Sequence, residues 1–281
     1  MRRAQATLPI PILLASIAAL LPPAAACEDQ GRPTAPDQTP AGYHLVWADE
    51  FDGGGAPNPM RWSYDVGGGG WGNNELQFYT ADRRENARVD GGYLVIEARR
   101  EPWEGRDYTS ARLVTKGKGD WTYGRIEVRA QLPSGRGSWP AIWTLGSTTP
   151  LTWPDDGEID IMEHVGFDPG VVHASIHTQR YNHVQGTQRT AQLSVPGAMS
   201  GFHVYATEWT ADRIQTSVDG RVYFEFAREP QGGHGAWPFD APQHLLLNIA
   251  VGGSWGGQQG IDDSLFPHRY QIDYVRIYQQ R

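Results

Sequence analysis

The chain has 281 residues, including 34 glycines, 20 prolines and a single cysteine, and its formal net charge at pH 7 is −8. One cysteine excludes an intramolecular disulfide, so the hydrophobic core must hold the fold. The acidic balance and the lack of a Lys/Arg cluster disfavour nucleic acid and heavily sulfated polysaccharides as partners.

The first residues have the pattern of an export signal. Arg2 and Arg3 precede an apolar run over residues 8–21, which is too short for a stable membrane anchor and ends in the small residues Ala24–Ala26. A buried first helix is the alternative, but four prolines would interrupt it. We therefore expect residues 1–26 to be a signal peptide. Removing them removes two arginines and no acids, so the charge of −8 becomes −10.

Cys27 follows this segment directly and resembles the site at which a bacterial lipoprotein is cleaved and lipidated; an unmodified thiol is the alternative. Residues 28–40 carry almost nothing apolar, so residues 27–42 are expected to form a flexible tether. Residues 43–281 are long enough for one domain. We expect a secreted, periplasmic or cell-surface protein, with membrane contact only through a lipid on Cys27.

Next along the chain come short runs in which apolar residues alternate with polar ones, the pattern of half-buried strands. These runs are separated by Gly-rich turns and show no long helical periodicity. They predict an all-β fold, a β-sandwich of two antiparallel sheets. The predicted strands are residues 93–98, 125–132, 172–177, 214–226, 244–251 and 270–278.

The segment from Trp153 to His164 carries the chemistry. In a strand that begins at Glu158, Glu158 and Asp160 point to one face and Ile159 to the core. Glu163 would then fall on the core side as an unpaired charge. A β-bulge at Met162 restores the parity and places all three acids on one face.

Acids packed this closely cannot all ionise independently, so one should keep its proton and act as a general acid. This pairing is what glycoside hydrolysis needs; the alternatives are a solvated acidic strand or a cation site. The Cα atoms of Glu158 and Glu163 would lie about 13 Å apart. Their side chains would leave a gap of about 5 Å, which predicts a retaining mechanism.

Aromatic residues support a carbohydrate substrate, because indole rings can stack on the apolar faces of sugars. The chain has 11 tryptophans, most of which we expect in the core. Trp71 and Trp255 lie in Gly-rich loops and are better candidates for ligand contact.

At this point the sequence resembles glycoside hydrolase family 16, in particular its bacterial laminarinases, which are endo-β-1,3-glucanases. The resemblance covers nearly all of residues 43–281 and includes the acid motif with its extra Met162. It implies a β-jelly roll with a concave substrate cleft. The matching segments are residues 49–52, 71–80, 110–113, 123–125, 139–143, 158–163 and 273–276.

The resemblance implies that Glu158 is the nucleophile, Glu163 the acid/base, and Asp160 a residue that tunes the pair. For Arg112 the alternative is a surface salt bridge; for His177 it is a structural histidine, with His173 on the same side of the strand as a substitute. The implied substrate-binding residues are Trp71, Asn74, Arg112, Trp139, Trp143, His177 and Trp255.

The resemblance implies no cofactor for catalysis and a structural calcium ion held by Glu50, Gly92 and Asp273, the first two through backbone carbonyls. The alternative is that Asp273 is an ordinary strand-end acid. We expect a monomer that cleaves a neutral β-glucan at β-1,3 linkages. A mixed-linkage glucanase, a galactan hydrolase and a non-catalytic β-glucan-binding protein are the competing functions.

Overall fold

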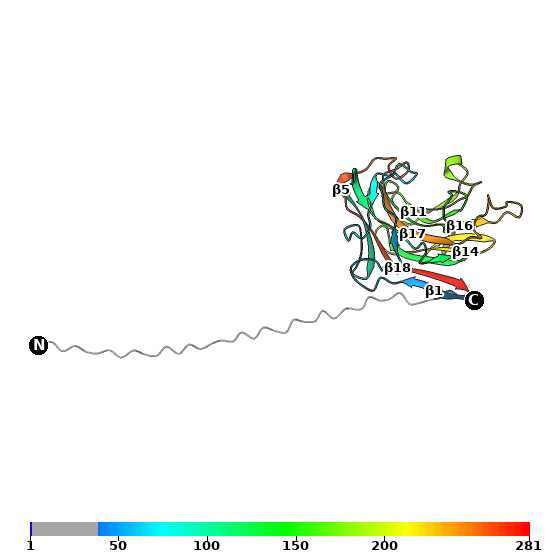
Figure 1. The fold of residues 1–281 in the computed structure, drawn as a ribbon, viewed down its shortest axis with the longest axis horizontal. Coiled ribbons are helices and arrows are strands. Elements are labelled where there is room, and N and C mark those ends of the chain that lie inside the picture. Colours follow the sequence, from blue (N-terminus) through cyan, green and yellow to red (C-terminus); the bar gives the residue numbers. More distant parts are fainter. Residues whose placement is uncertain (2–38) are drawn as a thin grey trace. The chain divides into compact units, whose positions relative to one another are not determined.

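The structure, a computed structural model, describes Met1 and residues 39–281; the predicted signal peptide after Met1, Cys27 and most of the predicted tether lie outside the described residues. The first strand, β1 (Tyr43–Asp49), pairs antiparallel with the last, β18 (His268–Gln280). Figure 1 shows β1 running beside β18, so the start of the domain lies next to its end.

One sheet contains ten strands and the other eight. The ten-stranded sheet has the order β16 (Arg221–Ala227), β15 (Arg213–Val218), β14 (His203–Trp209), β9 (Gly124–Gln131), β18, β5 (Tyr93–Trp103), β6 (Arg106–Ser110) and β3 (Gln77–Tyr79), with β1 on β18 and β4 (Ala87–Asp90) on β5. Its pairs are antiparallel except β3 with β6.

The eight-stranded sheet carries the candidate site. Its order is β13 (Arg189–Ser194), β12 (Val171–His177), β11 (Glu158–His164), β10 (Ser138–Gly146), β17 (Gln243–Val251), β7 (Arg112–Val114) and β2 (Ser63–Tyr64), with β8 (Asp120–Trp121) on β17. Two short 3-10 helices, η1 (His183–Gln185) and η2 (Asp263–Leu265), complete the described elements. β11 and β17 lie in one layer and β14 and β18 in the other (Figure 1).

The core lies between the two sheets, as the period-two pattern predicts. Ile126 and Val128 of β9 are almost fully buried and share one hydrophobic cluster with Ile159 of β11. Arg125 and Glu127, on the opposite face of β9, form an ion pair of 2.6 Å. The all-β sandwich fold is confirmed.

One predicted strand is wrong. Residues 214–226 form not one strand but the hairpin of β15 and β16, which turns at Asp219 and Gly220. Both turn residues have positive φ, 49° and 79°. An Asp-Gly pair suits this kind of two-residue turn, so the dipeptide was the signal that could have divided the run.

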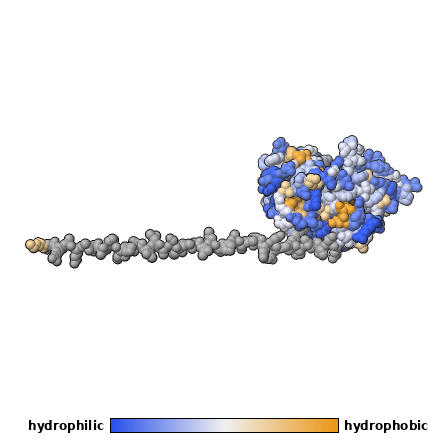
Figure 2. Space-filling view, turned by 60° about the horizontal axis from the view of Figure 1, so that its bottom comes forward, coloured by the Kyte–Doolittle hydropathy of each residue, from blue (hydrophilic) through white to orange (hydrophobic). Residues whose placement is uncertain are grey.

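The molecular face in Figure 2 is largely hydrophilic, with small and separate hydrophobic groups, which is ordinary for a protein surface. Within the part of the chain that the structure describes, no helix has the length and apolar character needed to cross a membrane.

Candidate active site

The three predicted acids lie on β11, which carries a bulge. Against β10, Asp160 pairs with Trp143 and Met162 pairs with Ile142, so Ile161 is the extra residue in this register. Ile161 and Met162 are both fully buried although they are consecutive. Against β12 the register shifts between Asp160 and Glu163, so Ile161 and Met162 together form the bulge. The predicted bulge at Met162 is therefore confirmed, and it returns Glu163 to the face of Asp160.

Glu163 lines the same hollow as Glu158 and Asp160, so the bulge brings the three acids together. Burial, and then the charge of Asp160, raise the pKa of Glu163 well above its ordinary value. Trp139 Nε1 donates a hydrogen bond of 3.0 Å to Glu163 Oε1, which acts in the opposite direction. Glu163 has the properties of a general acid, because it keeps its proton to a higher pH than an exposed glutamate does.

Asp160 is only 2% exposed, and its Oδ2 lies 3.3 Å from His177 Nε2. Burial, and then the charge of Glu158 and a hydrogen bond with it, raise the pKa of Asp160 well above its ordinary range. A protonated Asp160 can donate to Glu158 and reduce the repulsion between the two groups. Asp160 therefore lies close enough to Glu158 to affect its ionisation, and its tuning role stays a prediction.

Glu158 accepts a hydrogen bond of 2.6 Å from the indole Nε1 of Trp153. Trp153 belongs to the loop between β10 and β11, and its ring lies 5.1 Å from that of His183 in η1 and 6.0 Å from that of His177. Sequence reasoning did not select Trp153 or His183. The proximity of Trp153 to the acid motif was a usable signal, whereas His183 had none.

The two histidine candidates lie on the same strand, opposite different acids. His177 is paired with Glu158 in the register of β11 and β12, and His173 with Glu163. His177 contacts Asp160, while the ring of His173 lies edge-on to that of Trp255 at 4.9 Å. Both histidines therefore face the catalytic side of β12, His177 beside the predicted nucleophile and His173 beside the predicted acid/base.

Arg112 lies between two indole rings rather than on the surface. Its guanidinium carbon is 4.7 Å from the ring centroid of Trp71 and 4.6 Å from that of Trp143. Its Nε also forms an ion pair of 2.9 Å with Asp65, but only 8% of Arg112 is exposed. This cation–π stack fixes the three residues as one unit along the cleft.

Two adjoining hollows form the cleft, because five residues line both of them: Trp71, Asn73, Arg112, Trp143 and Glu158. One hollow extends past Trp153 and His183; the other contains Asp160, Glu163 and Trp139. A groove with aromatic walls and a floor of carboxyl groups suits a polymeric sugar that crosses β11.

The loop before β3 differs in detail from the prediction. Asn73 lines the cleft, whereas the side chain of Asn74 donates to Ser254 Oγ at 2.9 Å and lines a different hollow. The backbone explains this, since Trp71 and Asn74 both have positive φ, 51° and 57°. Trp255 lines neither hollow of the cleft, but its ring lies 5.4 Å from that of Trp139, which lines one of them.

Among the described residues, one group of side chains has the composition of a metal site: ligand atoms of Glu158, Asp160 and His177 lie within 4.8 Å of one another. Glu158 and Asp160 are two of the predicted catalytic residues and His177 is a predicted substrate-binding residue, so the group belongs to the candidate active site.

The predicted calcium residues lie elsewhere. β1 ends one residue before Glu50, and β5 begins one residue after Gly92. Both strands pair with the same edge of β18 on either side of Asp273. Backbone carbonyls and a buried carboxylate fit calcium in ligand type. Asp273 also forms an ion pair with Arg129, so a calcium ion would share the carboxylate with that guanidinium.

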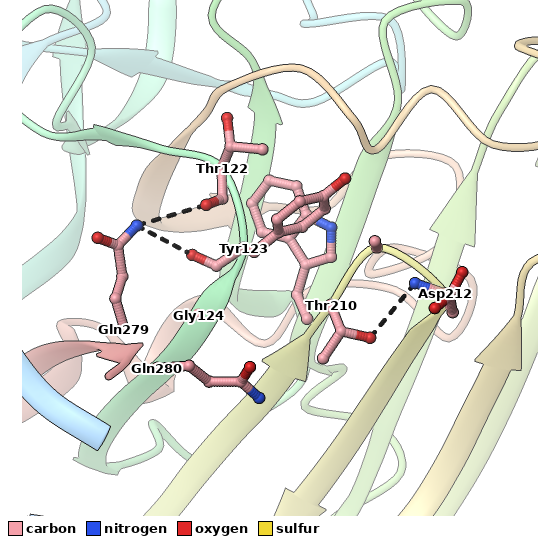
Figure 3. A pocket seen from close by; sticks show the side chains of 9 residues that line it. Thr122, Tyr123, Gly124, Thr210, Asp212, Gln279 and Gln280 are labelled. Atoms are coloured by element: carbon pink, nitrogen blue, oxygen red, sulfur yellow. Dashed lines mark hydrogen bonds between the residues drawn. The ribbon is translucent and has the colours of Figure 1, made fainter. Parts of the chain in front are cut away.

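A further hollow lies at the ends of β9, β14 and β18, in the other sheet. Figure 3 shows Gln279 donating to the backbone carbonyls of Thr122 and Tyr123 there. Asp212 is the only carboxylate among its lining residues. This hollow cannot supply an acid/base pair, so the cleft over β11 is the candidate active site.

The sequence profile of glycosyl hydrolases family 16 matches residues 74–276. A β-glucanase of Rhodothermus marinus is 60% identical over 246 residues, which cover 84% of this chain and 85% of that one. The X-ray structure of the laminarinase from the same species has a TM-score of 0.83 at 58% identity, covering 85% of this chain and 98% of that chain. A non-specific endo-β-1,3(4)-glucanase of family GH16, co-crystallised with 1,3-β-D-cellotriosyl-glucose, has a TM-score of 0.83 at 48% identity, with coverage of 86% and 96%.

Proposed function

Since the chain belongs to glycosyl hydrolases family 16 and is a glycoside hydrolase, we propose that it is an endo-acting enzyme that cleaves laminarin-type β-1,3-glucan with retention of configuration. The observation that carries the proposal is the bulge on β11, which puts Glu158 and Glu163 on one face of the cleft. Retention follows if the two carboxyl groups stand close enough for one to attack the sugar directly.

In the first step, Glu158 attacks the anomeric carbon and forms a covalent glycosyl-enzyme, while the bond to the leaving oxygen breaks. Glu163 gives its proton to that oxygen, a role that its raised pKa supports. In the second step, the ionised Glu163 takes a proton from water, and the water oxygen displaces Glu158. Proton and bond changes then balance over the two steps.

Asp160 keeps Glu158 available for attack. While Asp160 is protonated, it donates to Glu158 and fixes the direction of the attacking carboxylate. The contact between Asp160 Oδ2 and His177 Nε2 holds Asp160 in turn. These two residues position the nucleophile, and Glu158 makes the covalent bond.

Rates of cleavage of several polysaccharides test the proposed preference for β-1,3-glucan. We expect faster endo-cleavage of laminarin than of lichenan, agarose or carrageenan, with oligosaccharides as the early products. The acidic chain should in addition repel sulfated carrageenan. Faster cleavage of agarose or lichenan than of laminarin would contradict the proposed linkage while leaving the glycosidase assignment intact.

Two alternatives are distinguished by the same assay. A mixed-linkage glucanase would release products from lichenan at least as fast as from laminarin; the relative crystallised with a mixed-linkage oligosaccharide supports this second candidate. A non-catalytic glucan-binding protein would retain the polymer and release no reducing ends. The presence of both glutamates in hydrogen-bonded positions favours the enzyme.

We also propose a structural calcium ion at Glu50, Gly92 and Asp273, with no part in the reaction. The position of Asp273 beside the junction of β1 and β5 supports it. Removing calcium with a chelator should lower the melting temperature, and added calcium should restore it. An unchanged melting temperature would leave Arg129 as the partner that accounts for Asp273.

Finally, we propose that the protein is exported, acts as a monomer, and is anchored through a lipid on Cys27. The sequence of residues 1–27 supports the export and the lipid anchor. Mature protein from the natural host should partition with membranes and carry a diacylglyceryl mass, and Cys27→Ser should change its processing. A soluble, unmodified protein that begins at or just after Cys27 would reject the lipid anchor.

A further inference from the structure

Glu75 is a cleft carboxyl group that takes no part in the two steps above. It lines the same hollow as Glu158 and Glu163, although only 6% of its surface is exposed. Burial raises the pKa of Glu75, and hydrogen bonds from its neighbours together with the charge of Arg112 act against that rise. A buried carboxyl group must be hydrogen-bonded, and its partners reveal what each oxygen does.

On one side, a chain of hydrogen bonds begins at the indole of Trp143, which can only donate. Its Nε1 donates to Asn248 Oδ1 at 2.7 Å, so the amide nitrogen of Asn248 faces the other way and donates to the hydroxyl of Tyr79 at 3.0 Å. The hydroxyl then has its own proton left, and it donates to Glu75 Oε2 at 3.2 Å.

On the other side, the chain begins at a backbone N–H, which likewise can only donate. Val251 N donates to Gln77 Oε1 at 2.7 Å, so the amide nitrogen of Gln77 points away from it and donates to Glu75 Oε2 at 2.6 Å. Both chains end on the same oxygen. Glu75 Oε2 therefore accepts two hydrogen bonds and carries no proton.

The second oxygen, Oε1, has a single long contact with the Asn73 amide nitrogen, at 3.4 Å. Asn73 lines both hollows of the cleft, and the positive charge of Arg112 opposes the rise that burial causes in the pKa of Glu75. Oε1 thus retains most of its capacity as an acceptor, and it lies where a sugar in the cleft would pass.

We propose that Glu75 is a substrate-positioning and specificity residue whose Oε1 accepts a hydrogen bond from one hydroxyl group of a bound glucan. The inner oxygen ties Glu75 through Tyr79 and Asn248 to Trp143, so the acceptor and the aromatic wall are held in a fixed relation. This inference rests on the proposed function, because it takes the ligand to be a neutral glucan.

The network makes Glu75→Gln an informative substitution. Two donors still point at the Oε2 position, so the new amide oxygen must occupy it, and the amide nitrogen must replace Oε1. The cleft acceptor then becomes a donor while the internal hydrogen bonds persist. For one charged hydrogen bond, we expect a 10- to 100-fold loss in kcat/KM, mainly through a higher KM, on glucan oligosaccharides long enough to reach Glu75.

The experiment compares the wild type, Glu75→Gln and a matched control, Glu85→Gln, on laminari-oligosaccharides of increasing length. Glu85 is an exposed glutamate paired with Arg83. In the wild type, kcat/KM should increase sharply when the oligosaccharide becomes long enough for one of its sugars to reach Glu75. Glu75→Gln should lack this increase and should cleave the shorter oligosaccharides as the wild type does. A long oligosaccharide that lacks the hydroxyl group bound by Glu75 Oε1 should be cleaved equally well by the wild type and Glu75→Gln.

Other outcomes have distinct meanings. An equal loss by Glu75→Gln on every length, carried by kcat, would assign Glu75 a purely structural role and overturn the inference. Tyr79→Phe removes one donor to Oε2 but leaves Oε1 in place, so kcat/KM of this variant should still increase with oligosaccharide length. If Tyr79→Phe lacks this increase, the inference is also overturned. If the wild type does not cleave these oligosaccharides at all, the proposed function fails instead.

Discussion

The indole of Trp153 holds the carboxylate of Glu158 through a hydrogen bond of 2.6 Å, and Trp139 holds Glu163 in the same way at 3.0 Å. Each of the two predicted catalytic groups therefore accepts an N–H from a tryptophan at its own end of β11. An indole N–H can donate a hydrogen bond but cannot accept one. Each tryptophan therefore orients its carboxyl group and cannot accept a proton from it. The tryptophans of the cleft therefore orient the catalytic carboxyl groups in addition to offering surfaces on which sugars can stack.

Trp153→Phe keeps the ring and removes the donor to Glu158. Since attack requires a well-directed oxygen, we expect kcat on laminarin to fall by about tenfold or more, with a smaller change in KM. Trp103→Phe, at an exposed tryptophan of β5, is the matched control and should keep the wild-type rate. An unchanged kcat for Trp153→Phe would show that the contact does not position the nucleophile.

Removing the two glutamates should have different effects. Glu158→Ala should abolish hydrolysis, because no glycosyl-enzyme can form. Glu163→Ala should retain turnover on substrates with good leaving groups, and azide should restore its rate with a β-glycosyl azide as product. A β-glycosyl azide from Glu158→Ala, together with an α-glycosyl azide from Glu163→Ala, would reverse the roles.

The first product should have the β configuration. Two displacements at the same carbon restore the original stereochemistry, so NMR should detect the β-anomer before mutarotation. Laminarin and freshly added enzyme suffice for this measurement. Early appearance of the α-anomer would mean that a water molecule fits between carboxylate and sugar, and that the predicted gap of about 5 Å is too small.

Trp139→Phe should move the alkaline limb of kcat/KM to higher pH. The indole hydrogen bond lowers the pKa of Glu163, so its loss raises that pKa further. Glu163 must be protonated in the first step, and activity is lost as pH rises through its pKa. A pH profile of the variant beside the wild type checks the shift; a limb at the same or lower pH would exclude Glu163 as the group responsible.

Asp160→Asn should stabilise the protein at high pH and destroy most of its activity. The folded-state pKa of Asp160 is raised above the unfolded value, so the stability associated with its proton is present at low pH and lost as pH rises through the folded pKa. An asparagine cannot ionise. Urea unfolding between about pH 4 and pH 9 should show a gain of about 0.5–2 kcal/mol at the alkaline end that shrinks at the acid end. A gain that is constant with pH would point to packing instead.

The sequence was sufficient to predict those features that depend on the alternation of apolar and polar residues along a strand. The strand pattern predicted β9 and β18, and the cost of a buried charge predicted a bulge that returns Glu163 to the side of Glu158. The bulge includes the predicted Met162 together with Ile161, and burial alone does not tell which of these two core residues is the extra one.

Other features depend on backbone conformation or on distant parts of the chain. Asn73 rather than Asn74 reaches the cleft because the loop has positive φ at Trp71 and Asn74, where alternation has no meaning. The network around Glu75 joins positions more than 160 residues apart in the sequence, such as Tyr79 and Asn248. No periodicity within either segment could have predicted it.

The position of β18 has a consequence for synthesis. It follows all the other described strands in the chain, yet it lies between β9 and β5 in its sheet and also pairs with β1. During synthesis these three strands lack their neighbour until residues 268–280 have been made, so this sheet cannot close before then. For a chain with the export signal proposed for residues 1–26, this delay keeps the nascent polypeptide open enough to be threaded across a membrane before it folds.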